Sequence, residues 1–169
     1  MGEQRRAIVS SAHLADGAAP ALSELEFSLT LAATAYQRWL GRCAQAAGMS
    51  LSPLEVLILH SVRHRDRAKR LGDIALVLDI EDTHLATYAL RKLEKSGLVA
   101  TRREGKEKLI EATAAGREFC DAYRIIRERL LATPLAADGP AETALSEAAD
   151  LLRRISGQYN QAARAAATL

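Results

Sequence analysis

The sequence is poor in aromatic residues. Phe, Trp and Tyr make up only 4% of its 169 residues, whereas alanine and leucine abound, a composition that favours helices over a β-sandwich. With 49% hydrophobic residues, a chain of this length is expected to bury one ordinary core, and a second independent domain would be tight. We therefore expect a single domain of mainly α structure.

Cysteine is also scarce. Cys43 and Cys120 are too few and too far apart for a disulfide framework or a zinc knuckle. Both occupy apolar-periodic positions, which favours reduced thiols in the core over a redox or metal-binding role. His60 and His64 stand at i and i+4 and could hold a metal, but no Cys or acid lies at ligand spacing. A phosphate contact or an ordinary exposed helix is preferred there, and we predict no metal and no cofactor.

Long apolar runs and signatures of catalysis are absent as well. No stretch approaches about 18 uncharged apolar residues, and the N-terminus lacks an apolar segment with a cleavage site. We therefore expect a cytoplasmic protein without a membrane partner. The sequence contains no G-x-S-x-G, G-x-G-x-x-G, P-loop or H-E-x-x-H motif. It predicts no catalytic residues, and an enzyme is disfavoured.

Charge is nearly balanced over the whole chain but concentrated in its middle. The net charge is +2, from 23 Lys and Arg against 21 Asp and Glu. Residues 63–70, RHRDRAKR, hold five cations and one acid, and residues 91–108 hold seven cations against three acids. Such a local basic surface is expected of a protein that binds nucleic acid.

Long helices are predicted towards both ends of the chain. Residues 1–20 show no clear period and are interpreted as an arm of uncertain structure. Apolar residues then recur in alternating steps of three and four from Leu22 to Ala46, and again from Leu145 to Ala166. A further helix follows Thr113 and is expected before Pro134 and the break at AADGPA.

These heptad stripes suggest an interface between two copies of the chain. The helices at about 21–48 and 113–166 could instead cover the middle of the same chain as an intramolecular bundle. Because so short a chain has little middle to cover, we favour homodimerisation through them.

The middle of the chain, about 50–113, predicts three short helices and a hairpin. Ser52 before Pro53 is typical of a helix start, and this helix is expected to reach about His64. A second helix is predicted over 71–78. Asp82 or Thr83 caps a third helix. Its expected buried residues are Leu85 or Ala86, Ala89, Leu90 and Leu93.

A hairpin after the third helix completes the pattern. Gly97 stands where that helix needs a left-handed C-cap, and residues 100–110, ATRREGKEKLI, predict two strands with Gly105 at the tip. Two short helices joined by about four residues make a helix-turn-helix. With the hairpin, the order is that of a winged helix, in which the third helix enters the major groove and the wing flanks the duplex.

The third helix and the hairpin supply the candidate DNA-binding residues. Hydroxyl, imidazole and guanidinium groups suit base edges and phosphates, and a solvated helix face is the alternative. The candidates on the helix are Thr83, His84, Thr87, Tyr88 and Arg91. The candidates on the hairpin are Arg102, Arg103, Lys106 and Lys108.

The region 71–119 resembles the winged helix-turn-helix of the multiple antibiotic resistance regulator (MarR-type) family. The matching features are LGDIALVLDI as support helix, ALRKLEKSGLV as the end of the recognition helix, and TAAG opening the next helix. The flanking helices also match, so the resemblance covers about 20–165. The hairpin tip departs from the family's Asp-x-Arg signature, since it reads Arg103-Glu104-Gly105-Lys106.

The resemblance implies a mainly α fold, with a winged helix-turn-helix core between long dimerisation helices. It further implies a sequence-specific regulator of transcription, usually a repressor, that binds double-stranded DNA at a pseudo-palindromic operator. Such regulators are often released by a small ligand, and Tyr36, Trp39 and His60 are the candidates for contact with a small aromatic effector, or else plain core residues. The alternative function is a winged-helix docking module without DNA binding, which the low net charge supports.

Overall fold

The chain divides into two units, and the first of them, which ends at Tyr123, includes two helices before its winged helix. The computed structural model describes residues 8–9 and 11–169. Helix α1 (Ala12–Ala15) falls in the predicted arm 1–20, part of which lies outside the described residues. Helix α2 (Pro20–Ala46) contains the predicted heptad stripe, and Gly48, two residues after its end, has a φ of 99°.

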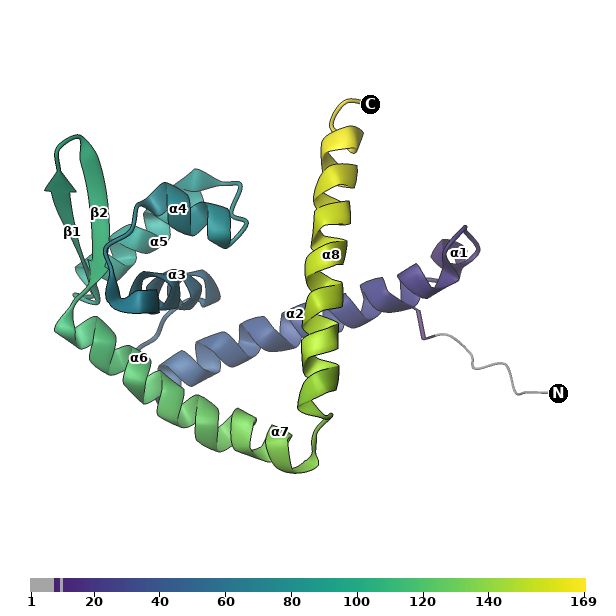
Figure 1. The fold of residues 1–169 in the computed structure, drawn as a ribbon, viewed down its shortest axis with the longest axis horizontal. Coiled ribbons are helices and arrows are strands. Elements are labelled where there is room, and N and C mark those ends of the chain that lie inside the picture. The colour runs from purple at the N-terminus through teal and green to yellow at the C-terminus, as the bar shows by residue number, and fades with distance from the viewer. Residues whose placement is uncertain (1–7, 10) are drawn as a thin grey trace. The chain divides into compact units, whose positions relative to one another are not determined.

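A winged helix follows in the same unit (Figure 1). Its parts are α3 (Pro53–Arg63), the 3-10 turn η1 (His64–Asp66), α4 (Leu71–Val77), α5 (Thr83–Lys95), β1 (Val99–Glu104) and β2 (Glu107–Ala112). Helix α3 packs against α5, α4 and β2, and α5 packs against β1. The core lies between them and is filled by Val56, Ile58, Leu59, Val62, Ile74, Leu90, Leu93 and Ile110. The predicted order of helices and hairpin is confirmed.

The two N-caps predicted in the winged helix both have side chains that accept hydrogen bonds from the following turn. At α3, the Ser52 hydroxyl accepts from the Glu55 amide at 3.3 Å, and the Ser52 amide donates to Glu55 Oε2 at 3.0 Å. At α5, Asp82 rather than Thr83 is the cap, because its carboxylate accepts from the amides of the following turn. That start turns Ala86 inwards and leaves Leu85 55% exposed.

The hairpin is an antiparallel pair in which Glu104 lies opposite Glu107. Two residues therefore form its tip, and Gly105 has a φ of 61°. Glycine at the first position of such a turn matches the right-handed twist of the strands. Gly97, at φ 71°, ends α5 as predicted. The wing is thus short, regular and fixed in register.

Helix α6 (Ala114–Arg127) follows the hairpin and closes the first unit. Its Phe119, Cys120 and Tyr123 are buried. Cys43 of α2 is buried too, and its thiol donates to the Tyr123 carbonyl at 3.7 Å. Burial raises the pKa of the Cys120 thiol to about 11. The prediction that both cysteines are core residues is confirmed, since both are free and buried.

The second unit, from Arg124 onwards, consists of the end of α6, the π-helical turn η2 (Glu128–Ala132), α7 (Thr133–Asp138) and α8 (Glu142–Ala166). The helix expected before Pro134 does not stop there, because helical structure continues to Asp138. Pro134 is tolerated because it lies in the first turn of α7, directly after the wider π turn. An amide donor is not required in the first turn of a helix, so the lack of one in proline costs little there. Helix α8 has no buried residue.

Candidate nucleic-acid interface

Helix α5 has a buried apolar side and an exposed polar side. Ala86, Ala89, Leu90 and Leu93 are buried against the rest of the lobe. The outward side carries all five helix residues predicted to bind DNA, of which Thr87 is half-buried and Thr83, His84, Tyr88 and Arg91 are exposed. Because the buried side fixes the rotation of the helix, the outward groups have a fixed register.

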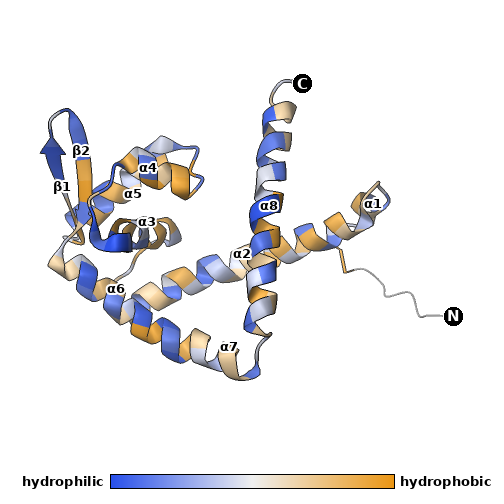
Figure 2. Ribbon diagram, in the orientation of Figure 1, coloured by the Kyte–Doolittle hydropathy of each residue, from blue (hydrophilic) through white to orange (hydrophobic). Residues whose placement is uncertain are grey.

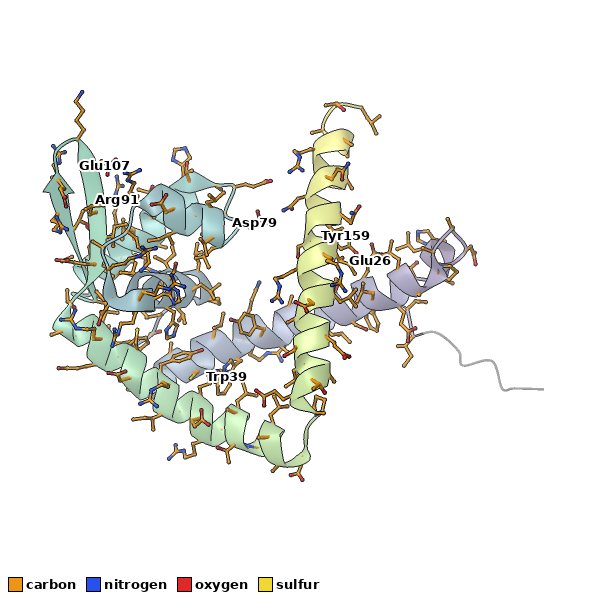
Figure 3. All side chains as sticks on the ribbon, viewed as in Figure 1. Glu26, Trp39, Asp79, Arg91, Glu107 and Tyr159 are labelled. Carbon is orange, nitrogen blue, oxygen red and sulfur yellow. The ribbon has the colours of Figure 1, made fainter. Side chains whose placement is uncertain are left out.

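The chemistry of this outward side suits a duplex. The Thr87 hydroxyl donates to the Thr83 carbonyl at 2.8 Å, which leaves its oxygen free to accept from a base edge. Among the described residues, Arg91 has no ion-pair partner, and Figure 3 labels it on the lobe that carries the hairpin. A guanidinium in this position can offer two parallel donors to a guanine.

A buried carboxylate ties α5 to α3. Lys92 Nζ lies 2.8 Å from Glu55 Oε1 and 5.6 Å from the centre of the Tyr88 ring. Burial alone raises the pKa of Glu55, but the hydrogen bonds from Lys92 and from the Ser52 amide outweigh it, so that its pKa falls below the ordinary 4.5. The hydrogen bond to Glu55 in turn raises the pKa of Lys92. This pair holds the last turn of α5 against the start of α3.

Replacing Glu55 with glutamine is expected to lower the free energy of unfolding at pH 7, and to matter less in acid. Because its pKa is lowered by folding, the stability that the carboxylate contributes is present above its ordinary pKa of 4.5 and lost as the pH falls through the folded value. Denaturant titrations at pH 7 and about pH 3 measure this. Glu118→Gln, at an exposed position on α6, is the control. Equal losses at both pH values would contradict the role of the charge.

The hairpin carries a basic face towards α5. Arg103 lies opposite Lys108 in the register. On the same face of the hairpin, the Thr101 hydroxyl donates a hydrogen bond to the Glu94 carboxylate of α5. Like charges placed directly opposite repel, so the pair of Arg103 and Lys108 favours an anionic partner. Lys108 also lies 3.6 Å from Glu94. Figure 2 shows the part of β1 nearest the tip of the hairpin as hydrophilic.

The other predicted hairpin residues differ in how free their charges are. Arg102 lies on the opposite face, with its guanidinium 2.6 Å from Glu104 and 3.9 Å from Glu111. Lys106 occupies the tip, and among the described residues neither it nor Arg103 has an ion-pair partner. Arg103 and Lys106 are therefore the hairpin cations whose charges are not neutralised by a carboxylate of the described residues.

One exposed residue of the interface was not among the candidates. Leu85 lies in the first turn of α5 and is 55% exposed, three residues before the exposed Tyr88. An apolar side chain on this side of the helix can contact the methyl group of thymine in the major groove. Steps of three and four residues back from Leu93 lead to Leu90 and then to Ala86, and not to Leu85. The helical periodicity of the sequence therefore indicates that Leu85 points outwards.

The three residues predicted to contact an effector are not brought together. Tyr36 lines a largely apolar groove of about 410 Å³ between α2 and α3, with Leu40, Pro53 and Leu57. His60 packs edge-on against Tyr123 at 4.7 Å between ring centres, and burial lowers its pKa. Trp39 is half-buried on α2 (Figure 3) and, like His60, does not line the groove.

Neither a metal centre nor a membrane span is found in the described part of the chain. No group of three or more His, Cys, Asp or Glu side chains is placed there to hold a metal ion. His64 is exposed, whereas the Nε2 atom of His60 is buried. Of the helices described, none is both long and apolar enough to cross a bilayer.

The lobe built by α3, α4, α5 and the hairpin is a winged helix, and residues 51–116 match the family model of the winged helix DNA-binding domain. Over 83% of the chain, the fold is similar to that of solved MarR-family regulators of transcription, as the sequence resemblance implied. Among curated proteins, no sequence matches the chain.

Three solved structures illustrate the likeness. A MarR-family regulator from Rhodococcus sp. RHA1 has 17% identity and a TM-score of 0.65, over 83% of this chain and 95% of that one. A mutant MarR from E. coli, complexed with operator DNA, has 15% identity and a TM-score of 0.67, over 83% and 99%. CouR from Rhodococcus jostii RHA1, bound to p-coumaroyl-CoA, has 18% identity and a TM-score of 0.65, over 78% and 90%.

Proposed function

We propose that the protein is a transcriptional regulator of the MarR type that binds double-stranded DNA with sequence preference and represses the genes it controls. The observation that carries this is the pairing of the fixed polar side of α5 with the unneutralised cations of the adjacent wing. The operator complex of a protein with the same fold supports it. We also propose that the protein is not an enzyme.

Selection of genomic fragments by the purified protein, followed by footprinting, tests this function. A regulator of this kind retains a small set of fragments and protects a pseudo-palindromic site, and its affinity falls steeply with salt because several phosphates are contacted. Retention of no duplex at low salt would identify a docking module instead. Footprinting also reports the symmetry of the bound site, and with it the number of lobes engaged.

The proposed regulator acts as a homodimer built from its long helices. Helix α2 has only four buried residues among 27, and α8 has none among 25. Their exposed apolar residues include Leu22, Leu31, Leu145, Leu151 and Leu152. Apolar helix faces of this length are expected to be covered by a second copy of the chain.

Light scattering is expected to report twice the chain mass of 18.3 kDa. Leu152→Glu should shift the protein to the monomer, because a carboxylate would be buried in the interface without a partner. Leu76→Glu is the matched control, since Leu76 is an even more exposed leucine and lies on α4. A monomer mass that does not change with concentration would refute the dimer.

The groove lined by Tyr36 is the proposed site for a small aromatic effector. It is largely apolar and adjoins Ser52, whose amide is bonded to Glu55, which in turn holds Lys92 of α5. A ligand bound there is thus linked to the recognition helix by two polar contacts. Trp39 is the single tryptophan of the chain and lies on α2, so its fluorescence should change with an aromatic acid that also loosens DNA. A panel of acids without either effect would count against the groove.

A further inference from the structure

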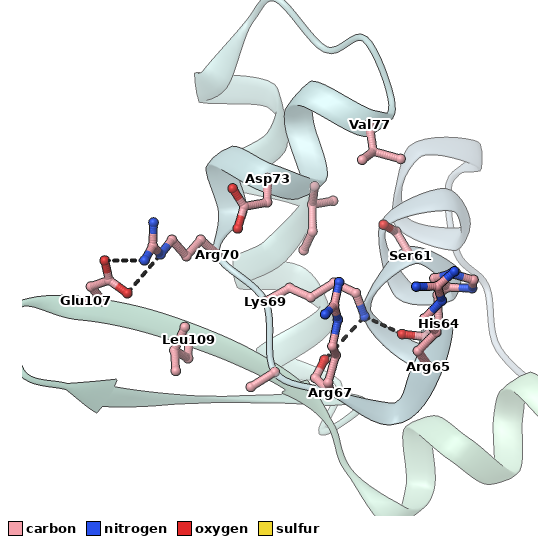
Figure 4. Close-up of a pocket in the computed structure, with 12 residues that line it drawn as sticks. Ser61, His64, Arg65, Arg67, Lys69, Arg70, Asp73, Val77, Glu107 and Leu109 are labelled. Carbon is pink, nitrogen blue, oxygen red and sulfur yellow. Dashed lines mark hydrogen bonds and ion pairs between the residues drawn. The ribbon is translucent and has the colours of Figure 1, made fainter.

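A second hollow lies in the winged helix, and its lining shares no residue with the groove lined by Tyr36 (Figure 4). Its volume is about 690 Å³, within the usual range of ligand pockets. The walls are the end of α3, the loop 64–70, α4 and β2, and the lining includes no residue of the recognition helix α5. Ile74, Val77 and Leu109 give it an apolar part.

The loop that forms its lower wall has an unusual backbone. Arg65 and Asp66 have φ angles of 59° and 49°, a left-handed conformation that non-glycine residues rarely adopt. The Lys69 ammonium holds this loop by donating to three carbonyls, of Val62 at 2.9 Å, His64 at 2.5 Å and Arg67 at 3.2 Å. Strained backbone of this kind is found more often at functional sites than elsewhere.

The hollow has more positive than negative charge. Four cations and two carboxylates line it. The Arg70 guanidinium donates to both carboxylate oxygens of Glu107, at 2.8 and 2.5 Å, and so neutralises that carboxylate. Asp66 of the loop forms an ion pair with Arg63 at 2.7 Å. Among the described residues, neither Arg65 nor Arg67 has an ion-pair partner, and Asp73 lies across the hollow from Arg67 (Figure 4).

The neighbourhood of Lys69 shows the same surplus of positive charge. Burial and the nearby Arg67 guanidinium both lower the pKa of the Lys69 ammonium, and Asp66 offsets only part of this. An anion between Arg65 and Arg67 would remove the repulsion. Guanidinium groups bind carboxylate and phosphate through two parallel hydrogen bonds.

We propose that this hollow binds a small organic anion, with its carboxylate or phosphate between Arg65 and Arg67 and its apolar body against Ile74, Val77 and Leu109. A concave site with an apolar part fits such a molecule better than it fits the phosphates of a duplex, which are met by protruding cations. The site is separate from the α5 surface and from the groove lined by Tyr36, and it does not rest on the proposed DNA binding.

Calorimetry with 1-naphthoate, its neutral amide 1-naphthamide and inorganic phosphate tests the proposal on the whole chain. Naphthoate is expected to bind about tenfold more tightly than either other probe, since it alone has both the charge and the apolar body. The double change Arg65→Gln, Arg67→Gln should weaken naphthoate about tenfold, and Val77→Asp should do so by repulsion. Lys95→Gln removes the same kind of charge from the exposed end of α5 and should leave the affinity within about twofold.

Amide chemical shifts locate the bound probe. Naphthoate is expected to shift the amides of Ser61, Ala68, Ile74 and Leu109, which line the hollow. Shifts confined to the groove between α2 and α3, or a naphthoate affinity unchanged by the arginine substitutions, would overturn the proposal. It would also be overturned if no organic anion bound while the same substitutions reduced the salt dependence of duplex binding, because the two arginines would then be phosphate contacts.

Discussion

Replacing Arg91 with alanine is expected to weaken binding to the preferred duplex by about 1–3 kcal/mol, or roughly 5- to 150-fold, and to affect random DNA much less. The reason is that Arg91 projects from a helix whose rotation is fixed by the buried Leu90 and Leu93. Its guanidinium can then hold one position against a guanine edge. Titrations of the two kinds of duplex at several salt concentrations measure the effect.

The wing supplies the matched comparison for Arg91. The double change Arg103→Ala, Lys106→Ala should weaken all duplexes to a similar degree, because these cations meet phosphates or the minor groove and carry little sequence information. The slope of log affinity against log salt should fall by about one unit for each phosphate that the variant no longer neutralises. If instead the wing change abolished sequence preference and Arg91→Ala preserved it, the wing would be the element that reads sequence.

Gly116→Ala is expected to cost about 3 kcal/mol of the free energy of unfolding, near the upper end of the usual cost of overpacking. A Cβ at this position would lie 2.0 Å from the Leu98 carbonyl oxygen, where the base of the hairpin meets α6. That carbonyl cannot retreat freely, because it accepts from the Thr113 amide at 3.1 Å. The hairpin and α6 must therefore separate.

Gly72→Ala is the control for this change. Gly72 lies in α4 of the same lobe, and nothing is within 4 Å of the position its Cβ would take. Alanine there should raise the free energy of unfolding by up to about 1 kcal/mol through helix propensity alone. Denaturant titrations at one protein concentration compare the two variants. A loss at Gly116 no larger than a few tenths of a kcal/mol would show that the close approach to Leu98 relaxes.

Local signals in the sequence were sufficient for the elements of the winged helix. Ser52 and Pro53 start α3, Gly97 ends α5 with a left-handed residue, and Gly105 turns the hairpin. Each works through its own backbone geometry and its nearest neighbours, so its effect can be predicted without the rest of the fold. The same is true of the outward side of α5, where periodicity separates polar from buried residues.

Contacts between distant parts of the chain could not be predicted in this way. Glu55 lies in the first turn of α3, and nothing in its local sequence indicates that it pairs with Lys92. The basic run 63–70 was recognised by its charge, yet its left-handed backbone and the use of Lys69 as a donor to three carbonyls depend on how α3 meets α4. Side-chain pairing across the tertiary structure decides such details.

The hairpin is bonded to helices on both of its faces, through Glu107 to Arg70 at the start of α4 and through Thr101 to Glu94 of α5. These contacts hold the wing against α4 and α5, and we expect it to meet a duplex without rearrangement. Its association rate should then be governed by diffusion and charge, and so be nearly the same for operator and random DNA. Operators of different affinity would then differ in how long the protein stays bound. The protein would dissociate sooner from a weak operator, although it associates with it at the same rate.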